Sequence, residues 1–403
     1  MLKRFRHLLR APERKASRTA RLIALDSGGR ARWTPRDYAA LAREGYQSNA
    51  IVFRAVRLIA EAIGSLSFVL YDGAAELTVH PLLDLLAHPN PRQDGASLLE
   101  GLSAHLLLSG NGYLEAVGVD GEGQTNVREL YALRPDRMKV VSGPDGWPQA
   151  YEYTVNGVTV RFDQASGSSL GVTHDVPPIL QLTLFNPLDD YYGLSPLEAA
   201  AVAVDTHNAA ARWNKALLDN AARPSGALVY DGPEGAIMAD AQFERLKKEL
   251  GEQYQGPANA GRPLLLEGGL DWKAMSLSPK DMDFMEAKHS AAREIALAFG
   301  VPPMLLAIPG DNTYSNYQEA NRVFWRQTVL PLGNRIGAAL AHWLAPAFGA
   351  GLTLAADTDR IDALAPDRAA LWERVTRAPF LTVNEKRTAT GYGALEGGDV
   401  LAS

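Results

Sequence analysis

The chain has 403 residues, of which 46% are hydrophobic and 21% charged, so it is long enough for two or three packed domains and has no disordered bias. It contains no cysteine, which excludes disulfides, thiolate nucleophiles and cysteine-ligated metal sites and is typical of a reducing compartment. The formal net charge of -6 argues against a tight, static DNA binder, because Lys and Arg supply most non-specific affinity for phosphates.

The first 35 residues form a basic segment. Up to residue 21, Glu13 is the single acid, and the basic residues are Lys3, Arg4, Arg6, Arg10, Arg14, Lys15, Arg18 and Arg21. No apolar stretch follows them, which excludes a signal peptide. We expect a disordered, solvated tail, and the alternative is a contact with a partner such as DNA.

Residues 36–194 combine helical and alternating patterns. Residues 49–66 carry apolar side chains at helical spacing, and Ser97 with Glu100 matches a capping box before a second helix. The apolar stripe of the first helix consists of Ile51, Val52, Ala55, Val56, Ile59, Ile63 and Leu66. From residue 112 to 184 the pattern alternates, and Asn156-Gly157 suits a two-residue hairpin turn. These patterns predict an α+β domain with antiparallel strands.

Two long helices are predicted after this domain, and both begin with the same pattern. Ser195-Pro196-Leu197-Glu198 offers an N-cap hydroxyl, a proline at the first helical position and an acid at the third, and Ser278-Pro279-Lys280-Asp281 repeats it. We expect helices at 195–222 and 278–300, each about 30–40 Å long. Charged residues interrupt the first, so we expect no membrane span.

Residues 223–277 form a small insert between the two helices. The pattern is a strand GALVY, a helix, and two further strands, RPLLLE and LDWKAM. The apolar residues of the insert's helix are Phe243, Leu246, Leu250 and Tyr254. We therefore predict a compact α/β module.

The chain after the second helix begins with a loop at 301–316 that is rich in Pro, Gly, Asn and Asp. Helical spacing then resumes from Gln318 to Phe348, with a kink expected at Pro331. A further helix is predicted near 368–377, and Thr382 with Glu385 forms a capping box.

The sequence contains no complete catalytic or metal-binding motif. The phosphate-binding motif G-x-x-x-x-G-K-[ST] and the zinc motif H-E-x-x-H are absent. Gly167–Gly171 matches G-x-S-x-G without a strand-to-helix elbow, and the acidic cluster 357–362 lacks the glycine of a calcium loop. His80 and His88 fit a rigid turn better than a ligand pair. We expect no enzymatic activity and no cofactor.

Six stretches spread over nearly the whole chain resemble portal proteins of long-tailed phages of the bacteriophage-lambda type. They are HPLLDLLAHPNP, LLLSGNGYLE, LYALRPDRMKV, YYGLSPLEAA, LSPKDMDFMEAKHSAAREIALAFGVPP and LTVNEKRTATGYGALEGGD. Their order and spacing together are specific, and the chain is also similar to the portal of a gene transfer agent. The resemblance implies one subunit of a ring, usually of twelve copies, through which double-stranded DNA enters and leaves a capsid.

The resemblance also implies an α+β portal fold divided into parts. These are the wing at 36–194, stem helices at 195–222 and 278–300, an α/β clip at 223–277, a channel loop at 301–316, a kinked helix at 317–348 and a helical crown at 349–403. The implied DNA-channel loop includes Pro309, Gly310, Asp311, Asn312, Thr313, Tyr314, Ser315 and Asn316. From the residues alone, a turn between two helices is the favoured interpretation of this loop.

Other candidate residues lie on the stem and the clip. Stem packing is expected at Trp213, Leu217, Phe284, Ile295 and Phe299, with Trp213 and Leu217 at a subunit interface. Partner docking on the clip is expected at Arg245, Lys247, Lys248 and Glu249, although a plain solvated face explains these residues equally well.

The resemblance implies several partners and a location. The partners are other copies of the chain, the major capsid protein, the large terminase that supplies the packaging ATPase, a head-tail adaptor and double-stranded DNA. The location is the portal vertex of a virion or phage-like particle assembled in the bacterial cytoplasm, and the basic arm could then contact the capsid shell. The alternatives are a capsid-associated adaptor without a channel and a nucleic-acid enzyme, and the lack of a catalytic constellation disfavours the enzyme.

Overall fold

A computed structural model gives the structure of the chain. It describes residues 34–35, 37–121, 124–164, 176–219, 226–230, 241–242, 244–245, 248, 270–274, 284–310 and 314–401. The chain divides into two units, Met1–Trp33 and Thr34–Ser403, and all elements below belong to the second. Residues 1–33 of the basic arm lie outside the described residues.

Helices α2 (Ala50–Gly64) and α4 (Gly95–Ser109) pack against each other in the main core. The predicted stripe of α2 is confirmed, since Val52, Ile59 and Ile63 are fully buried. A side chain at Gly64 would meet a backbone oxygen of α4 at 2.9 Å, so this glycine permits the close approach. The predicted cap of α4 was wrong, because Asp94 rather than Ser97 accepts the capping hydrogen bond.

Short helices flank this pair. The chain enters through α1 (Tyr38–Leu41) and the π-helical segment η1 (Ala42–Gln47), which leads directly into α2. Helix α3 (Pro81–Ala87) precedes α4, and the His80 side chain accepts a hydrogen bond from the backbone N–H of Leu82 at 3.2 Å. His80 therefore serves as the N-cap of α3.

Two antiparallel sheets follow α4 and confirm the α+β prediction. One has the order β4-β3-β8, and the other has the order β5-β6-β7. Their strands are β3 (Asn111–Gly121), β4 (Gln124–Leu133), β5 (Met138–Ser142), β6 (Pro148–Val155), β7 (Val158–Asp163) and β8 (Ile179–Thr183), with the turn η2 (Pro135–Arg137) before β5. Asn156 and Gly157 both have positive φ, as the predicted hairpin turn requires.

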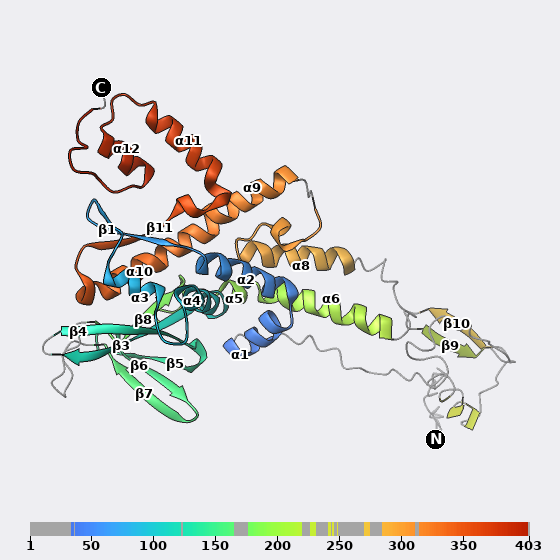
Figure 1. The fold of residues 1–403 in the computed structure, drawn as a ribbon. Helices are drawn as coiled ribbons and strands as arrows, with labels where there is room; N and C mark the ends of the chain where they lie inside the picture. Colours follow the sequence, from blue (N-terminus) through green and yellow to red (C-terminus); the bar gives the residue numbers. More distant parts are fainter. Residues whose placement is uncertain are drawn as a thin grey trace, which may run out of the picture. The chain divides into compact units, whose positions relative to one another are not determined.

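A third sheet joins distant parts of the chain. Strand β1 (Phe68–Asp72) lies between β2 (Ala75–Leu77) and β11 (Leu352–Ala356), and both pairings are antiparallel. Because β1 follows α2 directly, this sheet ties the C-terminal part to the helical core (Figure 1).

The first predicted stem helix is divided in two. The Ser195 hydroxyl accepts a hydrogen bond from the Glu198 backbone at 2.9 Å, which confirms the predicted cap. Helix α5 (Pro196–Ala199) ends at Ala200, and α6 (Ala201–Asp219) follows. The second helix is α8 (Phe284–Ala298), and the predicted cap at Ser278 lies outside the described residues.

The described part of the insert contains a hairpin. Strands β9 (Gly226–Tyr230) and β10 (Leu270–Ala274) pair antiparallel, as predicted for GALVY and LDWKAM. The predicted strand RPLLLE lies outside the described residues, as do Phe243, Leu246, Leu250 and Tyr254.

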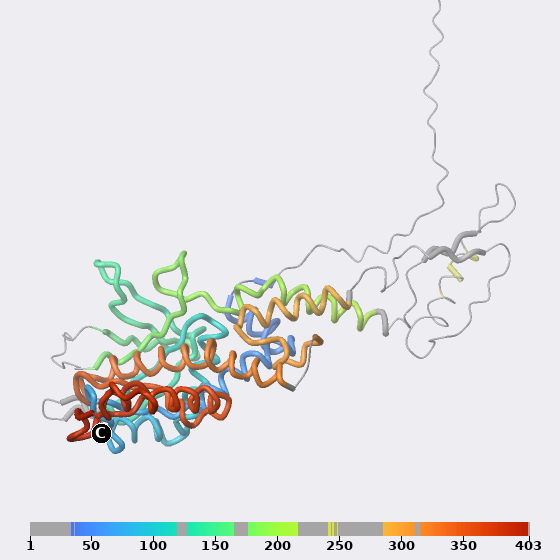
Figure 2. Tube along the Cα trace, turned by 90° about the horizontal axis from the view of Figure 1, so that it is seen from above, coloured from blue at the N-terminus to red at the C-terminus, as the bar shows by residue number. Residues whose placement is uncertain are grey.

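The helical segment after residue 313 changes from α-helix to π-helix and back, close to Pro331, where a kink was expected. Helix α9 (Tyr314–Phe324) passes into the π-helical segment η5 (Trp325–Val329), and α10 (Leu330–Phe348) follows with Pro331 in its first turn (Figure 2). A proline lacks the N–H that would continue the α-helical ladder, so the irregular turn just before Pro331 has a local cause.

The C-terminal region consists of short helical elements. They are η6 (Thr358–Arg360), η7 (Asp362–Leu364), α11 (Ala365–Thr376) and α12 (Val383–Thr390). Thr382 and Glu385 form both hydrogen bonds of the predicted capping box. Among the described residues, no helix combines the length and apolarity needed to cross a membrane.

Candidate functional site

Helices α6 and α8 lie side by side and run in opposite directions (Figures 1 and 2). The inner face of α8 is buried, and two predicted packing residues, Ile295 and Phe299, lie in the main core of the same chain. Trp213 of α6 remains 43% exposed, which is compatible with the predicted subunit contact. The side chains of Leu217 and Phe284 lie outside the described residues.

A buried polar network holds α6 against the start of α2. The Asn49 amide donates to Oδ1 of Asn208 at 2.9 Å and lies 3.1 Å from Nδ1 of His207. Asn208 in turn donates to the carbonyl oxygen of Glu44 at 2.8 Å. Sequence analysis missed this network; its signal is a run of polar residues, Asp205 to Asn208, between the apolar stretches AVAV and AAA of α6.

His207 has a lowered pKa. Burial is the main cause, and the nearby side chains of Lys288 and His289 on α8 act in the same direction. The imidazole is therefore kept neutral at the contact between the two helices.

Asp205 fixes the point at which the chain enters the unit. Its carboxylate accepts hydrogen bonds from the backbone N–H of Thr34 at 2.9 Å and from the Thr34 hydroxyl at 2.5 Å. Asp205 is buried, so these bonds lie inside the protein. The first described residue, Thr34, is therefore bound to α6.

The C-terminal end of α8 has a Schellman motif. Gly300 has positive φ and donates to Leu297, while Val301 donates back to Ala296 at 2.9 Å. The Thr328 hydroxyl donates to the Gly300 carbonyl oxygen at 2.5 Å. The turn after α8 is therefore held by hydrogen bonds to α8 itself and to Thr328.

Most of the predicted channel loop is ordered by its own contacts. Residues Pro303–Leu306 form the 3-10 helix η4, and the Ile308 side chain is buried. Arg293 of α8 donates a hydrogen bond to the carbonyl oxygen of Pro309. Richness in proline therefore did not exclude helical structure, because Pro302 and Pro303 suit the start of a short helix.

The predicted end of the loop was also wrong. Tyr314, Ser315 and Asn316 belong to the first turn of α9 rather than to a loop. Pro309 and Gly310 precede it, and Asp311, Asn312 and Thr313 lie outside the described residues. Of the eight predicted loop residues, Pro309 and Gly310 are therefore the described ones that lie outside α9.

The predicted docking residues of the insert are only partly described. Arg245 and Lys248 are exposed on a helical stretch, and Lys247 and Glu249 lie outside the described residues. Exposure on a helix is compatible with a docking surface and with a solvated face alike.

The described residues contain no cluster of three or more acidic or histidine side chains able to hold a metal ion. His80 caps a helix, and Asp359 accepts from Arg368 at 2.5 Å. The G-x-S-x-G match at 167–171 lies outside the described residues.

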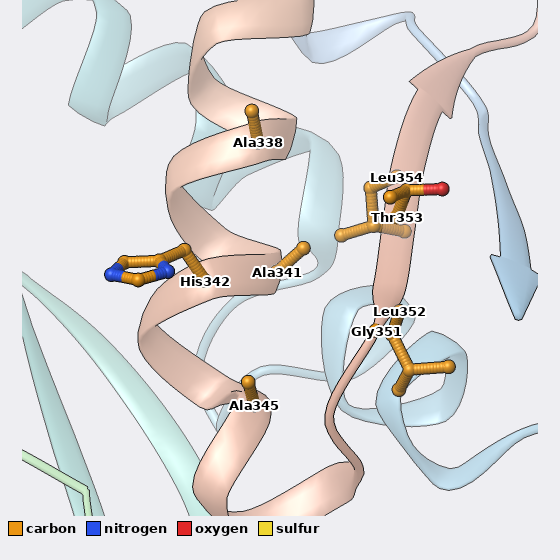
Figure 3. Close-up of a pocket in the computed structure, with 8 residues that line it drawn as sticks. All are labelled: Ala338, Ala341, His342, Ala345, Gly351, Leu352, Thr353 and Leu354. Carbon is orange, nitrogen blue, oxygen red and sulfur yellow. The ribbon is translucent and has the colours of Figure 1, made fainter. Parts of the chain in front are cut away.

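A pocket of about 340 Å³ lies between α10 and β11 (Figure 3). Residues of α10 form one wall, and residues in and just before β11 form the other. The lining residues are Ala338, Ala341, His342, Ala345, Gly351, Leu352, Thr353 and Leu354. The His342 ring points away from the strand, so the pocket offers no nucleophile with a matched base (Figure 3).

Comparison with known proteins gives consistent matches. Residues 50–391 match the family described as phage portal protein. A chain in the neck of a native gene transfer agent particle, computed with C12 symmetry, is 52% identical, with a TM-score of 0.67 and coverage of 92% of this chain and 97% of that chain. A protein of Rickettsia bellii (strain RML369-C) is 41% identical over 363 residues, 89% of this chain and 90% of its own length. The portal protein of Enterobacteria phage HK97 is 25% identical over 328 residues, 80% of this chain and 72% of its own length.

Proposed function

Because the chain belongs to the phage portal protein family, we propose that copies of it form a closed ring at one capsid vertex, around a channel for double-stranded DNA. The observation that carries this proposal is the match to the neck of a gene transfer agent particle, which extends over nearly the whole chain. The twelve-fold symmetry of that neck supports a ring of twelve copies here. The particle is a phage or a gene transfer agent.

Within the proposed ring, each segment of the chain corresponds to one part of a portal subunit. The pair α6 and α8 is the stem, the α+β region at 36–194 is the wing, and the insert at 223–277 is the clip. The short segment after Pro309 faces the channel, and residues 349–403 form the crown. This assignment is supported by the order of the elements, which places the insert between two antiparallel helices.

The charge of the chain suits a channel through which DNA slides, rather than a surface that binds DNA tightly. The net charge is -6, and the exposed part of α8 mixes Glu286 and Glu294 with Arg293. A wall rich in Lys and Arg would bind phosphates tightly and oppose sliding. The chain therefore lets DNA move in either direction, while a partner supplies the force.

The partners follow from this arrangement. We assign the packaging ATPase to a separate terminase, because the chain lacks a phosphate-binding motif. The terminase docks on the clip during packaging, and the head-tail adaptor takes its place afterwards, with Arg245 and Lys248 as contact candidates. The major capsid protein surrounds the ring, and we assign the chain itself no catalytic step.

The first test is the oligomeric state of the purified protein. Negative-stain electron microscopy with light scattering on the same sample should give rings of about twelve copies with a central hole. A monomer or dimer that persists at high concentration would contradict the ring. Binding to capsid shells without a central hole would instead indicate an adaptor.

A second test concerns the channel segment. Deleting residues 310–313 should leave rings intact, because the described contacts of η4 and α9 remain, while nuclease-protected DNA in particles is lost. A Gly/Ser replacement of equal length separates the effect of length from that of side chains. Normal DNA retention by the deletion variant would remove the channel assignment.

A further inference from the structure

The chain folds back over α8 after that helix ends (Figure 1). Ala307, which follows the short helix η4, has positive φ, a conformation that is uncommon for a residue with a side chain. The side chains of Leu306 and Ile308 on either side of it are buried in the main core. The returning chain is therefore anchored as far as Ile308, and Pro309 and Gly310 after it are exposed.

The first exposed peptide, between Pro309 and Gly310, is bound by Arg293 of α8. The Arg293 guanidinium donates a hydrogen bond to the Pro309 carbonyl oxygen, 16 residues further along the chain. Hydrogen bonds with a charged donor are about twice as strong as neutral ones. This bond therefore joins the helix to the far end of the segment that folds back over it.

Gly310 makes room for this guanidinium. A β-carbon at residue 310 would lie 2.9 Å from Nη2 of Arg293, so a side chain there would displace the guanidinium. Gly310 does not have positive φ, and its backbone conformation would accept alanine. The contact with Arg293, rather than the backbone, is therefore the structural reason for a glycine at this position.

The other end of the returning segment is held in a similar way. The Thr328 hydroxyl of η5 donates to the Gly300 carbonyl oxygen at 2.5 Å, and a β-carbon at Gly300 would lie 2.9 Å from the same hydroxyl oxygen. Each end thus combines a hydrogen bond to a backbone carbonyl with a close approach that glycine permits. Residues 300–310 are in this way connected to the helix before them and to the helical stretch after them.

On the basis of the channel segment proposed above, we infer that Arg293 is a positioning residue for that segment. Its guanidinium fixes the direction of the peptide between Pro309 and Gly310, from which the chain leaves the folded core. The stem helix α8, rather than the DNA, then sets the direction in which the channel segment begins.

A direct contact with DNA is the competing role for Arg293. A cation near the path of DNA can bind a phosphate and adds to the salt dependence of the interaction. In the structure, however, the guanidinium donates to a backbone oxygen and lies against a glycine that a methyl group would push aside. A phosphate contact would require neither feature, so the geometry favours positioning.

The test measures the mobility of a spin label placed just after Gly310. The chain contains no cysteine, so Asn312→Cys provides a single labelling site. Arg293→Ala should raise the ratio of mobile to immobile label about tenfold or more, because one charge-assisted hydrogen bond is lost. Gly310→Ala should also raise this ratio, because its methyl group displaces the guanidinium.

The variant with both substitutions decides whether the two residues act together. If Gly310 acts through Arg293, Gly310→Ala should add nothing to the mobility once Arg293 has been replaced by alanine. Additive effects, or an unchanged label in both single variants, would overturn the inference.

Arg335→Ala is the matched control, because Arg335 also donates to a backbone carbonyl oxygen, that of Thr183. It removes the same charge and the same kind of bond, and it should leave the label unchanged. Thermal unfolding by circular dichroism should show that all variants fold.

DNA retention connects the position of the segment to its function. Particles with Arg293→Ala or Gly310→Ala should form rings and lose nuclease-protected DNA by similar factors. A loss with Arg293→Ala alone, together with a weaker salt dependence and an unchanged label, would make Arg293 a phosphate contact and overturn the inference. The label is measurable whether or not rings form. A wild type without rings would therefore contradict the proposed function, while the label still decides whether Arg293 positions the segment.

Discussion

Helices α2 and α6 both bury one side in the chain's own structure, yet their exposed faces differ. On α2, Arg54 pairs with Glu61 at 3.4 Å, and the Arg57 guanidinium lies 5.9 Å from the Phe53 ring centroid. On α6, the exposed residues Val202, Thr206, Ala209, Trp213 and Ala216 carry no charge, and the charged residues Arg212 and Lys215 are exposed beside them. A helix face that meets water is charged and internally paired, whereas a face that meets another copy can remain uncharged.

The largest expected effect is on the free energy of unfolding, and it appears when one aliphatic side chain of α2 and one of α6 are truncated and compared. Ile59 of α2 is fully buried, so Ile59→Ala should lower the free energy of unfolding by about 2–5 kcal/mol through lost contacts and a cavity. Val202→Ala should change it by less than about 0.5 kcal/mol, because Val202 is exposed in the single chain. Urea unfolding below the assembly concentration measures both.

The same pair of variants should give the opposite ranking in assembly. Val202→Ala should weaken rings, since the side chain is exposed on a helix of the proposed stem, where copies of the chain would meet. If Val202→Ala destabilised the single chain as much as Ile59→Ala, the contrast between the two faces would be wrong.

Asn49 joins the two helices, and its removal should have the next largest effect. Its side chain accepts from Ile51 at 3.0 Å as the N-cap of α2 and also contacts His207 and Asn208. Asn49→Ala should cost about 2–3 kcal/mol, combining a lost cap with buried polar groups left unpaired. Urea unfolding measures the change.

Ser195→Ala is the matched control, because Ser195 caps α5 through one hydrogen bond outside this network. It should cost about 1 kcal/mol. Equal costs for the two variants would mean that the contacts to α6 contribute nothing.

The fold was predictable wherever one local pattern decided it. The stripe of α2, the Asn156-Gly157 turn and the Thr382 capping box each depend on neighbours in sequence, and all three are confirmed. The cap of α4 was mistaken because Asp94 and Ser97 compete for the same position, and only the backbone geometry selects between them.

The site was less predictable, because its contacts join distant residues. Asn49 and His207 are far apart in sequence, as are Thr34 and Asp205, so no spacing reveals them. The loop after α8 was predicted too long for a related reason. Its order comes from Arg293 and Thr328, which lie on the helices before and after it.

A smaller effect is expected from pH, through histidines packed against the same helices. Burial lowers the pKa of His105 on α4 to about 4, with Asp136 opposing and Arg134 reinforcing the shift. The unfolded chain binds the proton more tightly, so this contribution is complete above about pH 6.5 and is lost as pH falls toward 4. Between pH 7 and 5, the loss should be about 1–2 kcal/mol.

Comparison of the wild type with His105→Gln isolates this contribution from the carboxylates. The free energy of unfolding of the variant should depend less on pH between 7 and 5. Identical slopes would show that His105 is not held neutral in the folded chain.

Removal of the first 20 residues should have the smallest effect. The described hydrogen bonds at the N-terminal end begin at Thr34, which Asp205 of α6 holds through two bonds. If the basic arm is only a solvated tail, the truncated chain should form rings and retain nuclease-protected DNA as the full chain does. Thr34→Val provides a comparison, since it keeps the arm but removes one bond to α6. A loss of DNA by the truncated chain alone, with rings intact, would instead make the arm a contact for DNA.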